Sequence, residues 1–410
     1  MTIQDESALS APAVGHTASG RWPATAVFFL NGSALSTYIV RLPSLKAAHH
    51  LTDSQLGTIG MLFALAALTS MQFVGPLVAR VGSRPVLRAS LVIMPLLLAF
   101  MGSVHDLVVF AIGATALGMV HGATDVAMNA HAVTVERRGG RAILNGCHAA
   151  WSISAVVASL TAAGLAYAGA SYTTHLVAAG AVLLVGGLVV GPRLLPPEAE
   201  VSPETHPRRG RLGWRDGWTR PVVMVGLIGM GLMVCEGAAL GWSGIFLHDS
   251  KGASFGLAAT AVTAYTAGQT GGRLVGDRLT MRYGAAAVFR TGGLLATCGL
   301  TWAVLAGRPT TAVIGFAVMG LGTSVLLPLT FSAAGRIEAS GAGAAASVSR
   351  FTTFTYTGIL LGPSVIGWAA QVAGLTWTMA ALVPVLGGIA LLSRFPKLRS
   401  GAVPSREEPA

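Results

Sequence analysis

Two carboxylate side chains, Asp125 and Glu236, stand in the middle of long apolar runs of this sequence. An ionisable group at the centre of a bilayer costs roughly 2.5–3.5 kcal/mol, which makes each acid a candidate functional group. His121 and Asn129 flank Asp125 at a spacing of four, and residues four apart share a helix face. Burial favours the neutral form of a carboxyl group. We therefore predict proton coupling through Asp125 and His121 on this face and through Glu236 in its own apolar run. The alternative is a static carboxyl that is hydrogen-bonded to neighbouring helices.

Further polar and aromatic side chains recur at helical spacing in the same kind of run. His148 and Trp151 are three apart, and Tyr265 and Gln269 are four apart. An aromatic ring that stacks on a sugar face, flanked by amide and imidazole donors, is typical of a polyol site, although plain packing roles remain the alternative. The candidate substrate contacts are Asn129, Asn145, His148, Trp151, Trp242, Tyr265 and Gln269.

The composition places these residues in a membrane protein. The chain of 410 residues is 53% hydrophobic and 10% charged, whereas soluble domains carry about 25% charged residues. The net charge of +11 lies in short connections between apolar runs, which argues against nucleic acid as a partner. No metal-ligand spacing and no Ser/His/Asp constellation recurs, so we expect no metal, no cofactor and no enzyme.

Apolar runs long enough to span a bilayer predict an all-α membrane protein with twelve transmembrane helices in two pseudo-symmetric six-helix bundles. The predicted spans are 23–42, 57–79, 86–104, 107–133, 142–168, 171–190, 221–247, 255–276, 285–306, 310–334, 345–371 and 375–394. The predicted domains are an N-terminal tail 1–22, bundles 23–190 and 221–395, a linker 191–220 and a tail 396–410.

The charge of the connections predicts the orientation. One alternating set of connections carries most of the arginines, and the opposite set holds only Arg41, Lys46, Lys251 and Arg308. Basic residues concentrate on the cytoplasmic side, so both termini and the linker are predicted to be cytoplasmic. We therefore expect a multi-pass protein of the inner or plasma membrane, in contact with lipid.

Similar basic turns recur in both halves and carry a family resemblance. Residues 75–84 read Gly-Pro-Leu-Val-Ala-Arg-Val-Gly-Ser-Arg, and residues 272–284 hold a second copy. These turns resemble the loop motif of the major facilitator superfamily, although Ala79 stands where that family has Asp. The resemblance implies a conformational charge cluster formed by Arg80, Arg84, Asp277, Arg278 and Arg282, and a substrate site between the two repeats.

A finer resemblance lies in the fourth and fifth predicted spans. The acid-x-x-x-Asn spacing of Asp125 and Asn129 looks like the branch of that superfamily related to fucose permease, and residues 144–152 resemble its fifth helix. The first span lacks the acid that fucose permease has there, and His148 and Trp151 replace amide side chains.

This resemblance implies a monomeric secondary transporter that moves a small polar solute, sugar- or polyol-like, by alternating access with proton coupling (symport). One alternative is a proton-antiport exporter of a metabolite or antimicrobial. Another, from a different class, is a membrane sensor that does not transport.

Overall fold

The computed structural model describes residues 20–139, 143–196, 218–335, 337 and 341–392, and its regular elements over these ranges are all helical. In chain order they are α1 (Arg21–Val40), α2 (Leu42–Ala48), α3 (Asp53–Val81), α4 (Ser83–Ser103), α5 (Leu107–Gly139), α6 (Leu144–Tyr167), α7 (Tyr172–Val190), the short helical turn η1 (Gly191–Arg193), α8 (Arg220–Ile245), the π-helical turn η3 (Phe246–Ser250), α9 (Phe255–Tyr283), α10 (Ala285–Leu305), α11 (Pro309–Thr323), α12 (Leu326–Gly335), α13 (Gly341–Ala373) and α14 (Leu375–Leu392).

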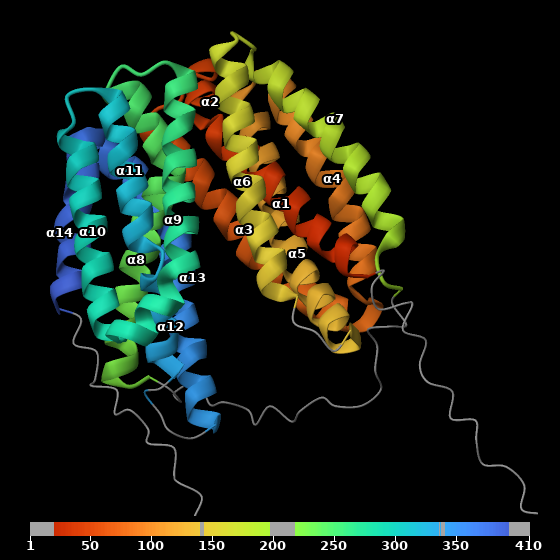
Figure 1. Ribbon diagram of the computed structural model, residues 1–410. Helices are drawn as coiled ribbons and strands as arrows, with labels where there is room; N and C mark the ends of the chain where they lie inside the picture. Colours follow the sequence, from red (N-terminus) through yellow and green to blue (C-terminus); the bar gives the residue numbers. More distant parts are fainter. Residues whose placement is uncertain (1–19, 140–142, 197–217, 336, 338–340, 393–410) are drawn as a thin grey trace, which may run out of the picture. The chain divides into compact units, whose positions relative to one another are not determined.

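The chain divides into two compact units (Figure 1). The first unit comprises Met1–Arg208 with Ser254–Thr263, and the second comprises Arg209–Ala253 with Ala264–Ala410. Helices α1 to α7 build the first unit, and α8 with α10 to α14 and most of α9 builds the second. The predicted linker 191–220 and both predicted tails fall largely outside the described residues.

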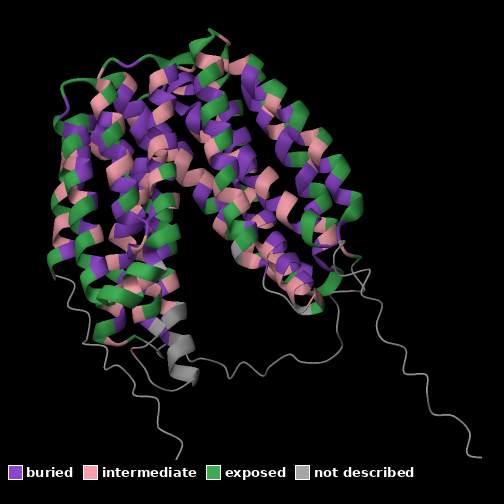
Figure 2. Cartoon of the chain, viewed as in Figure 1, coloured by how far each residue is buried: buried purple, intermediate pink, exposed green. Residues whose placement is uncertain are grey.

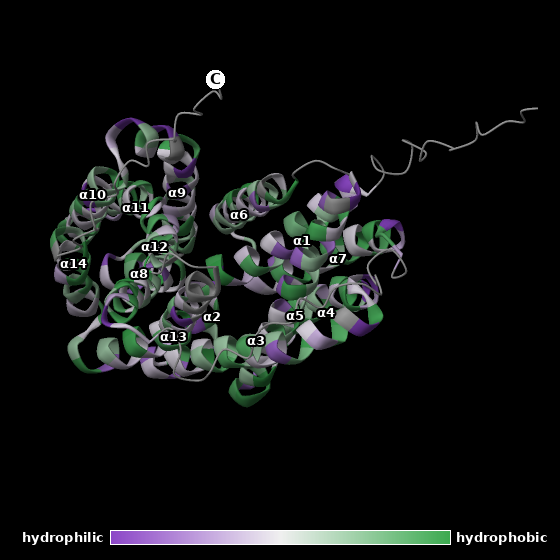
Figure 3. Cartoon of the chain, turned by 90° about the horizontal axis from the view of Figure 1, so that it is seen from below, coloured by the Kyte–Doolittle hydropathy of each residue, from purple (hydrophilic) through white to green (hydrophobic). Residues whose placement is uncertain are grey.

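Many helices are apolar on their outer faces as well as on their buried ones. More than two-thirds of the side chain is exposed at Phe73, Val182 and Trp377. Exposed residues line the outside of both units (Figure 2), and hydrophobic residues occur around the helices (Figure 3). Nine helices within the described ranges are long and apolar enough to cross a membrane. A helix that is hydrophobic all round suits lipid, so the prediction of an all-helical membrane protein is supported, while the count of twelve and the orientation stay predictions.

The structure departs from the predicted spans at two places. The first span, predicted to continue to 42, ends at Val40 and is followed by a short helix, α2, which has Pro43 in its first turn. The predicted run 310–334 is divided into α11 and α12 at Ser324 and Val325. Pro328 has no N–H to donate to the carbonyl four residues earlier, that of Ser324, which accounts for the break.

Turns with left-handed backbone recur at matching places in the two halves. Gly82 (φ 78°) precedes α4, and Gly284 (φ 83°) precedes α10, a separation of 202 residues (82 to 284). His50 and Gly252 also have positive φ and are 202 residues apart (50 to 252). A positive φ strains residues that carry a Cβ, so shared positions support a duplicated chain path.

Glycines bring helices into backbone contact at equivalent crossings. A Cβ on Gly118 of α5 would lie 2.2 Å from the Phe63 carbonyl oxygen of α3. A Cβ on Gly320 of α11 would lie 2.0 Å from the Tyr265 carbonyl oxygen of α9, and both residues are again 202 positions on. Small residues permit such approach between membrane helices, and these crossings fix the helices that carry His121 and Gln269.

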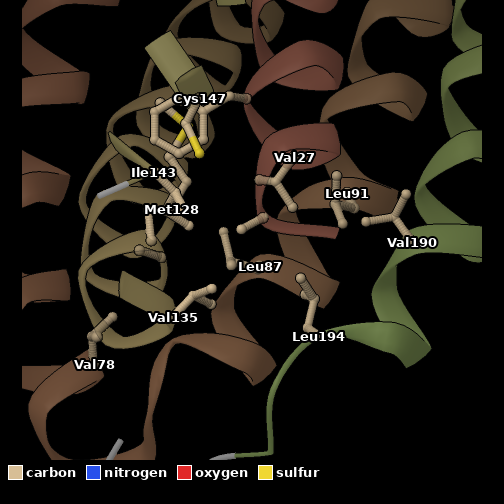
Figure 4. Close-up of a cluster of buried hydrophobic side chains, with 14 residues drawn as sticks. Val27, Val78, Leu87, Leu91, Met128, Val135, Ile143, Cys147, Val190 and Leu194 are labelled. Carbon is tan, nitrogen blue, oxygen red and sulfur yellow. The ribbon is translucent and has the colours of Figure 1, made fainter. Parts of the chain in front are cut away.

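A buried apolar cluster holds one end of the first unit together (Figure 4). Val27 of α1, Leu87 and Leu91 of α4 and Met128 of α5 point toward one another, with Val190 at the end of α7. Close packing of such side chains contributes dispersion energy that lipid contacts do not fully replace. The cluster sets the depth of α1 and α5 against each other, and so positions the polar residues one or two turns further along.

The basic residues of the sparsely charged connections have internal partners. Arg41, 3% exposed, donates from Nε to Nδ1 of His175 at 2.9 Å. Lys46 pairs with Asp53 at 2.5 Å. Lys251 donates to the carbonyl oxygens of Val304 and Ala306 at 2.7 and 2.8 Å; burial lowers the pKa of this lysine, and it caps the C-terminal end of α10.

The glycine crossing predicts that Gly118→Ala destabilises the protein by about 1–3 kcal/mol, because the added methyl group meets a backbone oxygen that cannot move aside. Gly164→Ala is the matched control, since a Cβ there meets nothing within 4 Å, and it should be neutral or gain up to about 1 kcal/mol of helix propensity. Thermal unfolding in detergent measures both variants. Equal melting temperatures would contradict the backbone contact.

Candidate functional site

Three polar side chains from three helices of the first unit meet at Asn31. The Trp151 indole Nε1 on α6 donates to Asn31 Oδ1 at 3.1 Å, and Asn31 Nδ2 lies 3.4 Å from His121 Nδ1 on α5. Asn31 is 2% exposed on α1. A buried amide needs partners for both its donor and its acceptor, and here they come from two of the predicted site residues.

The backbone next to Asn31 makes this meeting possible. A Cβ at Gly32 would lie 2.8 Å from the Trp151 carbonyl oxygen and 2.3 Å from Ser154 Oγ. The absent side chain therefore lets α1 and α6 touch at the level where the indole reaches the amide.

Aromatic rings surround the polar contact. Phe63 stacks on His121 with ring centroids 6.0 Å apart, and Tyr38 stacks on Phe63 at 6.1 Å. On the other side, Phe28 meets the ring of His148 edge-on at 5.1 Å. Apolar rings exclude water from the amide and imidazole, which strengthens the hydrogen bonds between them.

The arrangement determines how Asn31 and His121 hold their protons. An indole N–H only donates, so the atom of Asn31 that faces Trp151 must be its oxygen. The amide nitrogen then faces His121 and donates to Nδ1. His121 accordingly accepts at Nδ1 and carries its proton on Nε2, as a neutral imidazole.

Asp125 lies one helical turn from His121 on α5 and is partly buried. Asn129, predicted to share its polar face, donates from Nδ2 to the backbone carbonyl oxygen of Asp125 at 2.8 Å. The Asn129 amide thus has an intrahelical partner near the acid. Thr124, next to Asp125, also bonds its own helix, at the Val120 carbonyl.

The second unit brings two of its predicted residues together. Gln269 Nε2 on α9 donates to Glu236 Oε1 on α8 at 3.1 Å, and Gln269 is 6% exposed. Tyr265, fully buried one turn away, shares a hydrogen bond of 3.1 Å with Thr323 of α11. Trp242, predicted as a substrate contact, is 2% exposed within α8, and that contact stays a prediction.

Asn31 was not among the predicted site residues, although the sequence contains a signal for it. Residues 31–35 read Asn-Gly-Ser-Ala-Leu, and residues 236–240 read Glu-Gly-Ala-Ala-Leu. Each motif lies in the first long helix of its half. The two motifs are 205 residues apart (31 to 236), three more than the spacing of the turns and crossings, and both side chains are hydrogen-bonded in the structure.

The remaining predicted residues are more dispersed. His148 is exposed on α6, and the side chains of Asn145 and Asp277 lie outside the described residues. Of the predicted charge cluster, Arg84 donates to the Pro192 carbonyl at 2.8 Å, while Arg80, Arg278 and Arg282 are exposed. No group of three His, Cys, Asp or Glu side chains that could hold a metal occurs within the described ranges.

One small cavity borders Asn31 on the side of α4 and α7. The cavity next to Asn31, bordered by Ser90 and Thr124, has a volume of about 10 Å³. That volume is close to the minimum for one water molecule. A solute would therefore have to meet this group from its partly exposed side, which Trp151 and His148 share.

Comparisons with known proteins give the family. Residues 24–259 match the family model described as Major Facilitator Superfamily. A relative from Sinorhizobium fredii, named as the uncharacterized transporter y4wD, is 33% identical over 375 residues and covers 88% of this chain and 96% of its own length.

Solved structures agree on the fold. The nucleoside transporter NupG superposes with a TM-score of 0.73 at 13% identity, covering 91% of this chain and 97% of NupG. The transporter FucP in its outward conformation superposes with a TM-score of 0.57 at 17% identity, covering 90% of this chain and 97% of FucP. The chain belongs to the Major Facilitator Superfamily and is a multi-pass membrane transporter, not an enzyme.

Proposed function

We propose that the protein takes up a small polar solute, sugar- or polyol-like, together with protons, by alternating access across the inner membrane. The observation that carries this proposal is the Asn31 group: one amide that joins an imidazole to an indole, with Asp125 one turn away on the same helix. The group combines proton-binding side chains with the aromatic face and polar donors that a sugar requires.

Asn31 provides a physical link between a proton and the solute. A proton added at His121 Nδ1 would place two donors, N–H and NH₂, against each other. Asn31 would then have to rotate, and rotation removes the acceptor from the Trp151 indole. Protonation of His121 thus removes the hydrogen bond that holds the Trp151 ring, the ring that would stack on the solute. A proton gradient therefore biases the affinity for the solute.

Asp125 supplies the acid that exchanges protons in this scheme. An intramembrane carboxyl changes between neutral and charged states at high energetic cost unless polar groups or water accompany it. Asp125 has His121 and Asn129 a turn away on its own helix. Glu236, held by Gln269, is the second acid of the scheme and takes part in solute recognition or in coupling.

The nature of the solute follows from the chemistry around Trp151. NupG is a nucleoside transporter by its description, and a nucleoside also presents a sugar. The partly exposed Trp151 ring offers a stacking face, and the exposed imidazole of His148 offers a donor or an acceptor. We therefore expect a neutral solute with several hydroxyl groups.

Asp125→Asn should abolish proton-driven accumulation in proteoliposomes while solute counterflow continues, because exchange requires no net proton movement. Addition of the right solute to wild-type vesicles should raise the external pH. Substrates are found by counterflow over a panel of sugars, polyols, nucleosides and antibiotics.

Asp106→Asn is the matched control for this experiment. Asp106 caps α5 by accepting from the Val109 N–H at 2.9 Å, and asparagine caps a helix equally well. The control should keep both activities. Proton coupling through these acids is refuted if Asp125→Asn and Glu236→Gln both accumulate solute normally, and a fall in external pH would indicate antiport.

Asn31→Ala should raise the solute concentration needed for half-maximal counterflow by about tenfold, since it leaves the Trp151 N–H without its acceptor. Trp151→Phe should do the same by removing the donor and shrinking the stacking face. Trp377→Phe, on an α14 side chain that is 73% exposed, is the matched control. Unchanged counterflow in both site variants would exclude this group from solute binding.

A further inference from the structure

A groove of about 590 Å³ lies between α1 and α6, at the end of the first unit where both helices begin. Arg21, Trp22, Thr25 and Phe29 of α1 line one side of it, and Gly146 and Ala150 of α6 line the other. Transport chemistry at Asn31 makes no use of these side chains.

The groove is on the side of α1 that faces away from the unit's core. Ala24, Val27 and Phe28 of the same helix belong to the buried apolar cluster, whereas Trp22 is 47% exposed. Figure 1 shows α1 running between α6 and α7. Residues 22, 26 and 29 follow one stripe of the helix, so an elongated apolar molecule would lie along α1.

Positive charge gathers at the open end of this stripe. The Arg21 side chain lines the groove, and the Arg193 guanidinium lies over the Trp22 ring at 5.8 Å from its centroid. Arg193 also donates to the Val189 carbonyl oxygen of α7. One guanidinium thus lies over the Trp22 indole, and a second, that of Arg21, lines the same groove.

Glu136, an acid at this end of the unit, is hydrogen-bonded to backbone N–H groups. Glu136 Oε2 accepts from the backbone N–H of Ile143 at 2.9 Å. It holds the first turn of α6, and among the described residues Arg21 and Arg193 form no ion pair. Two cations, an aromatic ring and an apolar stripe together suit a charged head and a hydrocarbon tail.

We propose that this groove binds one phospholipid with a net negative headgroup. The phosphate lies between Arg21 and Arg193, and the glycerol region lies against the Trp22 ring, an arrangement favoured for indoles at membrane interfaces. One acyl chain follows Ala26, Phe29 and Ala150 toward the middle of the helices. Basic pockets between membrane helices recognise anionic headgroups by the same electrostatics.

The occupant is a lipid and not a free anion, because the apolar stripe contributes affinity only if a hydrocarbon chain covers it. A second possible occupant is the chain's own residues 1–19, which directly precede the groove and include Asp5 and Glu6. These possibilities give different results when phosphatidylglycerol, phosphatidylcholine and inorganic phosphate are compared.

Native mass spectrometry of the full chain in detergent, titrated with phosphatidylglycerol or phosphatidylcholine, tests the proposal. The wild type should bind one phosphatidylglycerol in preference to phosphatidylcholine, and inorganic phosphate should not compete. Arg21→Gln should weaken phosphatidylglycerol binding by about fivefold, the effect of one basic residue near a charged headgroup. Arg138→Gln, an exposed arginine on α5 with the same loss of charge, should leave it unchanged.

Gly146→Leu is a second variant that fills the groove and keeps the fold intact. A Cβ at Gly146 meets no atom within 4 Å, so leucine occupies the path of the acyl chain without a clash. It should reduce phosphatidylglycerol binding and leave the melting temperature of lipid-free protein unchanged.

Equal binding of the two lipids, or equal effects of Arg21→Gln and Arg138→Gln, would overturn the proposal. So would full competition by inorganic phosphate, which indicates an anion site alone. Lipid binding that begins only after removal of residues 1–17 would show that the groove belongs to the chain's own tail.

Discussion

The side-chain amide of Asn31 is the contact on which the arrangement of the first unit depends. Each of its two ends is committed, the oxygen to an indole N–H and the nitrogen to an imidazole nitrogen. In an apolar interior an unmet donor or acceptor costs about 1–3 kcal/mol, so α1, α5 and α6 are held at one mutual height. The glycine at position 32 allows α1 to approach α6, and the crossing at Gly118 sets α5 against α3.

Duplication explains why the two units share a frame and differ in chemistry. Positive-φ turns and backbone-contact glycines recur 202 residues apart (82 to 284, 118 to 320). On that frame Phe63 and His121, which stack in the first unit, correspond in position to Tyr265 and Thr323, which share a hydrogen bond in the second. Asn31 and Glu236 stand in similar motifs of the first long helix of each half, 205 residues apart (31 to 236). The two halves keep the same turns and helix crossings, but the first has an amide and an imidazole where the second has other polar groups.

Much of this architecture follows from elementary features of the sequence. Long apolar runs with charge confined to short connections predict membrane helices, because lipid tolerates little else. The break at Ser324 and the short helix after Val40 escaped prediction, because hydropathy alone does not register a lost proline hydrogen bond or a turn of one residue. Trp151, His121, Glu236 and Gln269 were singled out from the sequence, but the hydrogen bond between Glu236 and Gln269 was not expected.

Asn31 was missed for a physical reason. An uncharged side chain in an apolar run carries no insertion penalty large enough to attract notice, and its importance arises only when three helices meet. Trp242, predicted as a solute contact, has a ring that is buried within its own unit, and its role stays a prediction. Spacing along one helix reveals which residues share a face, whereas contacts between helices require the register set by the glycines.

The protonation state of His121 is the central element of this account. Nitrogen-15 NMR of histidine-labelled protein in lipid measures it, with the His121 signals identified by their loss in His121→Gln among the ten histidines of the chain. A neutral ring with hydrogen on Nε2 is expected in the solute-free protein at high pH. As pH falls, the ring should become doubly protonated and the Trp151 indole signal should shift. A ring with hydrogen on Nδ1, or an indole signal that ignores the titration, would contradict this account.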